Sequence, residues 1–208
     1  MLFWAVRQLC MPCNYLRIRH GESFLESKAV YDFVIPAVLT LLTAGFTALI
    51  GSPLTLFGQQ TVFQALSGLL AILIGFYMAA LAAVATFHRE GIDDKMKGGD
   101  ATLMVASVIG GEKKPKPLTY RQFISYLFGY ASFLSFVIYA FLLVVGSVWP
   151  RLVAIAEGFR WWPEIMAIGI GPAVYLLVFF AIWQLFITSL LGIYFLAERI
   201  QSLSDPDR

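Results

Sequence analysis

The residues best suited to chemistry in this chain are two cysteines, Cys10 and Cys13, with His20 a few positions further on. A Cys-x-x-Cys pair near a histidine can bind zinc, but a structural zinc site needs four ligands and these residues supply three. A redox role needs a thioredoxin-like strand and helix around the pair, and that context is missing. We therefore interpret both cysteines as reduced cytoplasmic thiols, and we expect no metal and no cofactor.

The rest of the sequence offers no set of catalytic residues. The chain has two histidines, His20 and His88, and it contains no HExxH, GxSxG or Walker lysine motif. Asp, Glu, Lys, Arg and His are also absent from the interior of every long apolar segment. Because such residues mark proton relays and coupled transporters, we expect neither an enzyme nor a coupled transporter.

Composition places these residues in a membrane protein. The chain is 59% hydrophobic and 13% charged, against about 25% charged residues in a soluble protein. Four apolar segments are long enough to cross a hydrocarbon layer, which takes about 20 residues. Each must be helical, because lipid offers no partner to free backbone groups. We predict an all-α polytopic membrane protein with four transmembrane helices at 30–50, 62–87, 119–148 and 171–197.

The basic residues are divided unequally between the connecting segments. All of the fifteen Lys and Arg residues except Arg151 and Arg160 lie in segments 1–29, 88–118 and 198–208 or at the start of the third helix. The loops 51–61 and 149–170 hold only those two arginines. Since basic residues favour the cytoplasmic side of short loops, we expect both termini and the middle loop in the cytoplasm. The expected location is the bacterial inner membrane.

The middle loop is too long for a structureless connection, so we expect it to be folded or docked. A strand pair about the glycines of 96–109 is one reading, and an apolar patch lying on the surface or re-entering the membrane is the other. The basic stretch that follows contains Pro115 and Pro117, which favour extended polyproline II geometry. We expect its basic side chains to contact anionic lipid or a cytosolic partner: Lys113, Lys114, Lys116 and Arg121.

The third helix carries a recognisable start signal. Thr119 and Gln122 have the spacing of a capping box, and Leu118 and Phe123 have that of a hydrophobic staple. Pro117 discourages any earlier start. We therefore predict that this helix begins near Thr119 in water and then enters the membrane.

Small residues recur at every fourth position of the second segment, at Ala71, Gly75, Ala79 and Ala83. Such a stripe lets another helix approach closely, either in the same chain or in a second subunit. A Gly75→Leu substitution is accordingly expected to weaken helix association. Serine, threonine, glutamine and tyrosine residues in the third and fourth segments allow two readings, a polar pathway or helix-packing hydrogen bonds, and we favour packing.

Two segments are typical of the membrane interface. The outer stretch contains Trp149, Arg160, Trp161 and Trp162, whose amphipathic side chains suit headgroup depth. At the other end, residues 1–10 are apolar but interrupted by an arginine, and we expect a short interfacial helix with Phe3 and Trp4 as anchors.

A layout of four spans with both ends inside resembles the membrane subunit of the Kiwa anti-phage defence system. The stretch KKPKPLTYRQFISYLFGYASFLSF, together with the short amphipathic ends, carries this resemblance. It implies an oligomeric inner-membrane sensor that works with a cytosolic, DNA-associated partner, and it transfers no catalytic residue.

Together these observations favour a non-enzymatic sensor or scaffold subunit that is homo-oligomeric and recruits or controls a cytosolic effector. The resemblance implies anti-phage defence as its setting, and we expect no direct contact with nucleic acid. We expect sensing of the membrane or of an outer partner through Trp149 to Gly171, and partner contact through the middle loop and termini. The alternative, from another class, is an ion channel or a holin-like pore former.

The charge distribution yields a topology prediction. With Cys10 and Cys13 changed to serine, a cysteine introduced near Gly158 should react with a membrane-impermeant reagent from the periplasm. A cysteine near Gly98 should stay protected, because its segment is predicted to be cytoplasmic. Reversed labelling of intact cells would overturn the predicted orientation.

Overall fold

The computed structural model describes residues 2–18, 28–50, 62–86, 91–95, 101–106, 113–156, 161 and 169–199. Four described helical segments are long and apolar enough to cross a membrane. They coincide with the four predicted segments, so the prediction of a helical four-span protein is confirmed in this respect. The candidate spans are Val30–Ile50, Gln64–Thr86, Tyr120–Trp149 and Gly171–Ala197.

Helices dominate the described chain, and one small sheet interrupts them. The elements in order are α1 (Leu2–Leu9), the 3-10 helix η1 (Met11–Arg17), the π-helical η2 (Val30–Val34), α2 (Ile35–Ile50), α3 (Val62–Thr86), β1 (Thr102–Ala106), β2 (Lys113–Pro117), α4 (Tyr120–Ala156), α6 (Gly171–Tyr194) and the π-helical η4 (Phe195–Arg199).

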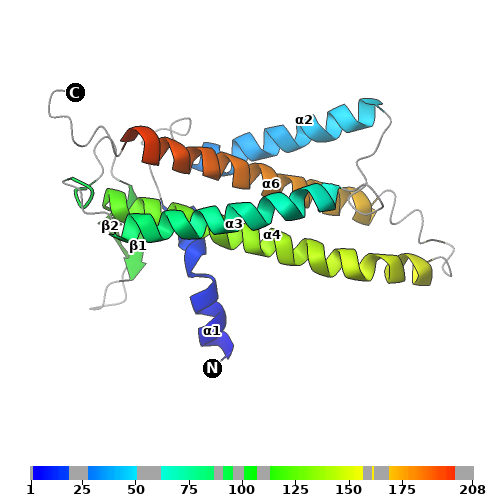
Figure 1. The fold of residues 1–208 in the computed structure, drawn as a ribbon, viewed down its shortest axis with the longest axis horizontal. Coiled ribbons are helices and arrows are strands. Elements are labelled where there is room, and N and C mark those ends of the chain that lie inside the picture. The colour runs from blue at the N-terminus through cyan, green and yellow to red at the C-terminus, as the bar shows by residue number, and fades with distance from the viewer. Residues whose placement is uncertain are drawn as a thin grey trace.

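The spans pack around α4. It lies against α3 on one side and α6 on another, whereas α2 contacts α6. Figure 1 shows α2 diverging from α6 toward the end of the bundle opposite the hairpin, and α1 leaving the bundle crosswise to the spans. The chain therefore forms a three-helix core with α2 attached along one side.

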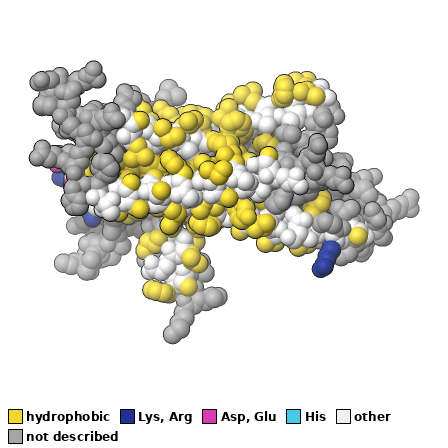
Figure 2. All heavy atoms as spheres, in the orientation of Figure 1, with side chains coloured by type: hydrophobic (Ala, Val, Ile, Leu, Met, Phe, Trp, Pro, Cys, Tyr) yellow, Lys and Arg dark blue, Asp and Glu magenta, His cyan; other side chains and the backbone are white. Residues whose placement is uncertain are grey.

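The surface of the bundle agrees with a hydrocarbon environment. On the face drawn in Figure 2, hydrophobic and uncharged atoms cover the middle, and the basic side chains in view lie toward its two ends. Large apolar side chains on α2 are more than half exposed, among them Leu41, Leu42, Phe46 and Leu49. In water such a surface would be unfavourable, but in lipid it needs no protein partner.

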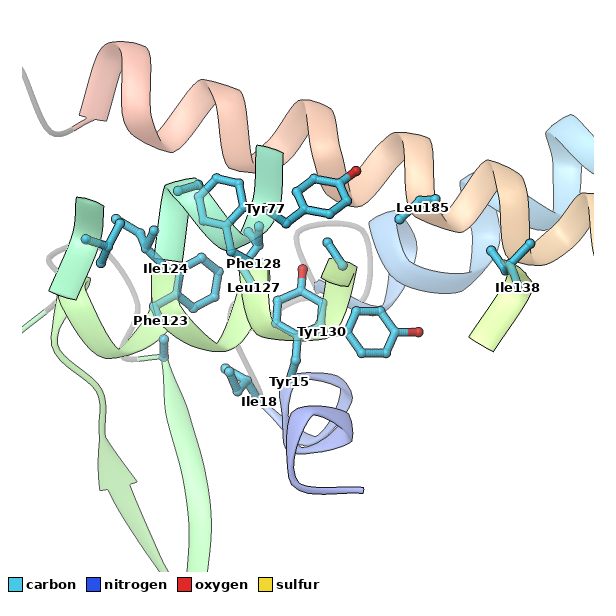
Figure 3. Close-up of a cluster of buried hydrophobic side chains, with 14 of the residues drawn as sticks. Tyr15, Ile18, Tyr77, Phe123, Ile124, Leu127, Phe128, Tyr130, Ile138 and Leu185 are labelled. Atoms are coloured by element: carbon cyan, nitrogen blue, oxygen red, sulfur yellow. The ribbon is translucent and has the colours of Figure 1, made fainter. Parts of the chain in front are cut away.

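Aromatic and aliphatic side chains fill the space between α3, α4 and α6, as Figure 3 shows for Tyr77, Leu127, Phe128 and Leu185. Tyr77 and Phe128 come from facing helices, and their rings lie 6.2 Å apart. Hydrogen bonds between side chains also join neighbouring helices. The Tyr77 hydroxyl pairs with that of Ser189, and Trp183 Nε1 donates to Thr43 Oγ1 at 3.1 Å.

Gly192 marks a close approach of α6 to α4. A Cβ at this position would lie 2.9 Å from Leu127 Cδ2 and equally close to two ring atoms of Phe128. Both neighbours are completely buried, so neither has room to move away. Gly75 differs, because a Cβ there would meet nothing within 4 Å.

The third helix is longer than predicted at its C-terminal end. It runs to Ala156 instead of ending at residue 148, and it passes through Pro150. At 1.5 Å per residue its 37 residues extend about 55 Å, well beyond a ~30 Å hydrocarbon layer. The predicted outer segment 149–170 is thus in part the last turns of α4. A proline removes one backbone hydrogen bond but is tolerated in membrane helices.

Residues 157–160 and 162–168 of that segment, which include Arg160 and Trp162, lie outside the described residues. Trp149 is half-buried on α4, and Trp161 is exposed. The expected short helix at the N-terminal end is present as α1, where Trp4 is exposed. The side chain of Phe3 is not among those described.

Gly192 and Gly75 give a matched pair for testing the packing. Gly192→Ala should lower the free energy of unfolding in detergent by about 1–3 kcal/mol, because the added methyl group overpacks a filled site. Gly75→Ala adds the same atom to open space and should leave the stability of one chain unchanged. Equal stabilities for the two variants would contradict the close contact between α6 and α4.

Candidate functional site

A buried ion pair lies where the first span begins. Lys28 and Asp32 are four residues apart on one helical turn, and their side chains are 5% and 4% exposed. Nζ of Lys28 contacts Oδ2 of Asp32 directly. Asp32 belongs to η2, where the helix is wound more widely than an α-helix, and such π-helical turns often occur at functional sites.

The N-terminal segment closes over this pair through Tyr15. Lys28 Nζ donates to the backbone oxygen of Tyr15 at 2.9 Å and lies 3.4 Å from the centre of the Tyr15 ring. The ammonium group thus receives a carboxylate, a carbonyl oxygen and an aromatic face in place of water. Burial of a charge is costly without such partners, which explains why η1 must dock here.

Two further helices complete this site, which we call the ion-pair cluster: Tyr15, Lys28, Asp32, Tyr130 and Gln184. The rings of Tyr15 and Tyr130 are stacked with centroids 5.1 Å apart, so η1 rests on α4 (Figure 3). Gln184 on α6 donates from Nε2 to the backbone oxygen of Asp32 at 3.0 Å. The cluster therefore joins η1, the first span, α4 and α6 at one point.

The electrostatics of the cluster follow from its burial. Desolvation lowers the pKa of Lys28 below its usual 10.5, and the Asp32 carboxylate opposes that shift. Burial and the nearby Asp32 raise the pKa of Tyr15 well above its usual 10.0. The Tyr15 hydroxyl nevertheless makes no well-formed hydrogen bond. The arrangement clamps helices together and contains no nucleophile paired with a base.

Sequence reasoning missed this cluster. Lys28 counted only as one of the basic residues before the first span, and Asp32 only as a charge at the edge of that span. The four-residue spacing of opposite charges was a usable signal, because such residues face each other on a helix. Nothing local in the sequence indicates that Tyr15 or Gln184 would join them.

A second structured region, which we call the hairpin cap, consists of residues 91–95, 101–106 and 113–119. β1 and β2 pair in antiparallel register, with Leu103 opposite Lys116. We predicted that both strands of a pair would lie within 96–109. This was wrong, because β1 lies in that range but pairs with the basic stretch that follows it. That stretch is extended as expected, but it is a strand of a sheet.

The hairpin cap is fastened to the start of α4 mainly by backbone groups. Tyr120 N donates to Asp94 O at 3.3 Å, and Arg121 N donates to Ile92 O at 3.0 Å. The predicted capping box is confirmed, since Gln122 N reaches Thr119 Oγ1 at 3.3 Å and Thr119 N reaches Gln122 Oε1 at 3.4 Å. These bonds satisfy amide groups that a helix start leaves without partners.

Arg121 has an internal role that we did not predict. Its guanidinium binds both carboxylate oxygens of Asp93, at 2.7 and 3.1 Å. Nη1 also donates to the backbone oxygens of Val84 and Ala85 at the end of α3. We expected Arg121 to contact a partner or lipid, but its donors link the hairpin cap to α3 and α4.

The lysines of the basic stretch belong to β2. Lys116 is exposed, whereas the side chains of Lys113 and Lys114 are not among those described. Leu118 donates its N–H to Ala101 O at 2.9 Å, and the alternation of a strand turns the N–H of Lys116 the same way. The nitrogens of Pro115 and Pro117 therefore face the outer edge of β2, where they present no donors.

The small-residue stripe faces away from the core. Ala71, Gly75, Ala79 and Ala83 are all exposed on α3. The stripe thus makes no close helix contact within the described chain. Of the two partners considered from the sequence, a helix of a second subunit is the one that remains. Our expectation for Gly75→Leu accordingly applies to association between chains.

The cysteines sit at the joint between α1 and η1, with Cys10 exposed and Cys13 partly buried. Burial and the neighbouring Cys10 raise the pKa of Cys13 above its usual 9.0, which favours the thiol over the reactive thiolate. His20 and His88 lie outside the described residues. Within the described ranges, no three His, Cys, Asp or Glu residues gather as a metal site would require.

The chain was compared with protein-family models, curated proteins and solved structures, and none of them matches it.

The ion-pair cluster predicts a characteristic pattern of stabilities. Lys28→Met or Asp32→Leu alone should each cost about 3–5 kcal/mol, because the remaining charge is buried without its partner. The double variant should recover most of this loss, since it removes both charges together. Unfolding in detergent measures all three, with Lys116→Met as an exposed-lysine control. Single variants as stable as the unmodified chain would show that the pair is solvated.

Proposed function

We propose that this protein is a non-enzymatic sensor or scaffold subunit of the bacterial inner membrane that recruits or controls a cytosolic effector. The hairpin cap carries this proposal. It is a folded basic surface fixed at one end of a four-span bundle. Connecting two spans does not by itself require such a fold, which suggests a further role for it. A surface held in constant orientation relative to the membrane is suited to docking a soluble protein.

Charge and rigidity support the cap as the docking surface. Its strand β2 brings three lysines together, and Lys116 and Pro115 are exposed there. The hairpin cap is held in a fixed orientation, because hydrogen bonds of Arg121 and of the Tyr120 backbone join it to the end of α3 and the start of α4. A change in how α3 and α4 pack would therefore move the cap and whatever binds it.

The orientation in this proposal rests on the distribution of basic residues. The hairpin cap lies in the most basic connecting segment, so we place it in the cytoplasm together with both termini. The exposed stripe on α3 supports assembly of several copies. In line with the resemblance to the Kiwa membrane subunit, we propose anti-phage defence as the setting and a cytosolic effector that does the work.

The interior of the bundle supports packing over a conducting pathway. Ser135, Thr188 and Ser189 each donate to a backbone oxygen four residues earlier in their own helix, at 2.6–2.8 Å. These hydroxyls are thus satisfied without water, and large apolar side chains such as those of Phe128 and Leu185 are buried in the same interior. A pore remains the alternative function, and it would have to form between copies of the chain.

Partner capture tests the proposed docking surface. Changing Lys113, Lys114 and Lys116 to glutamine should reduce the amount of soluble protein that copurifies from native membranes by at least roughly tenfold, the effect of 1.4 kcal/mol. Arginine at the same three positions is the matched control, because it keeps the charge and should keep the partner. Capture unaffected by glutamine would place docking elsewhere.

Single-channel recording tests the alternative. The purified protein in a planar bilayer should give no steady ion-selective conductance, because the described core contains no continuous polar path. Reproducible, ion-selective conductance from the purified protein would favour the pore and contradict the scaffold.

A further inference from the structure

The N-terminal arm, residues Leu2–Ile18, ends in a helix that the rest of the protein hardly touches. Within the described residues α1 packs chiefly against η1, which continues directly from it. Trp4 is 68% exposed, Leu9 69% and Met11 45%. Trp4 and Leu9 are among the most exposed large apolar side chains of the described residues, and both belong to α1, which leaves the bundle (Figure 1).

An isolated helix of this size needs a surface to rest on. Helices shorter than about 12–15 residues are marginal in water even when their sequence favours helix. α1 has eight residues, including an exposed tryptophan. An apolar surface that covers Trp4 and Leu9 would both stabilise the helix and remove these side chains from water.

Geometry identifies that surface. Tyr15 of the arm holds Lys28, and Lys28 lies two residues before the first span begins at Val30. The arm is therefore fixed at the level where the first span leaves the membrane. Figure 1 shows α1 running crosswise to the spans at this point, which is the direction of the membrane plane. A helix in that position lies along the boundary of the bilayer.

The positive charge of the N-terminal arm indicates which kind of surface it binds. The first 21 residues contain Arg7, Arg17 and Arg19 but no Asp or Glu. Arg17 is exposed at the end of η1. A basic segment with exposed tryptophan and leucine suits a negatively charged headgroup layer better than the face of an average soluble protein.

We propose that the N-terminal arm binds the anionic lipid surface at the hairpin end of the bundle, and that Tyr15 couples this binding to the first span. Tyr15 is fully buried, stacks on Tyr130 and covers the ammonium of Lys28. Insertion or release of α1 thus acts on the residue that closes the ion-pair cluster. This deepens the proposed function, on which it rests for the sensing role, by naming the sensed ligand as anionic lipid.

Cys10 is a natural probe of the arm's position, because it is exposed at the end of α1. In full-length Cys13→Ser protein, a nitroxide on Cys10 should be accessible to oxygen and shielded from a water-soluble nickel complex in nanodiscs containing phosphatidylglycerol. Trp4→Glu should reverse both accessibilities. A label that stays accessible to the nickel complex in these nanodiscs would overturn the lipid assignment.

Thermal unfolding tests the coupling. Anionic lipid should raise the midpoint by about 2–4 °C for each arginine that it engages, compared with phosphatidylcholine alone. Trp4→Glu should abolish this shift by releasing α1. Tyr15→Leu should abolish it while the Cys10 label stays buried in lipid. Arg151→Gln, an exposed arginine at the other end, should retain the full shift.

The labelling and thermal-unfolding experiments test the arm independently of the copurification experiment that tests the docking surface. If α1 enters lipid and Tyr15→Leu keeps the full shift, the coupling is wrong. If the coupling holds but no soluble protein copurifies, the lipid-binding arm stands and the effector proposal fails.

Discussion

Burying Lys28 against Asp32 imposes a constraint that the surrounding structure must satisfy. Removing two charges from water costs several kcal/mol for each ion, and their mutual attraction offsets this only when further polar contacts are supplied. Here η1 supplies a carbonyl oxygen and an aromatic face through Tyr15, and Gln184 binds the backbone beside Asp32. The buried ion pair consequently depends on three features together: the docked N-terminal arm, the position of α6 and the π-helical start of the first span.

The polar groups of the interior fall into two classes with different roles. Hydroxyls such as those of Ser135 and Thr188 bond back to their own helix, so they permit burial without specifying a neighbour. The contacts of Tyr77 with Ser189 and of Trp183 with Thr43 cross between helices, so they fix which helices meet. Gly192 adds the close approach that lets α6 lie against α4.

The features that the sequence predicted correctly are those set by local rules. Span positions follow from stretches of apolar residues, and the start of α4 follows from Thr119 and Gln122, which contact each other three residues apart. The sheet was misread because Pro115 and Pro117 favour an extended chain whether or not it is paired, and their partners Met104 and Thr102 lie 11 and 15 positions earlier in the sequence. Arg121 and Tyr15 act across long sequence separations, and no local pattern encodes such contacts.

The prolines of β2 also limit how hairpins of neighbouring copies can join. Two hairpins can pair only if each offers a free strand edge. Chains confined to one membrane meet often, because their effective concentration is high. A sheet grows without end only if each unit has two edges to offer. Because Pro115 and Pro117 remove two donors from the free edge of β2, that edge pairs poorly and the edge of β1 is the better one for a second strand. Any strand pairing between copies would therefore favour a closed pair over growth into a fibre.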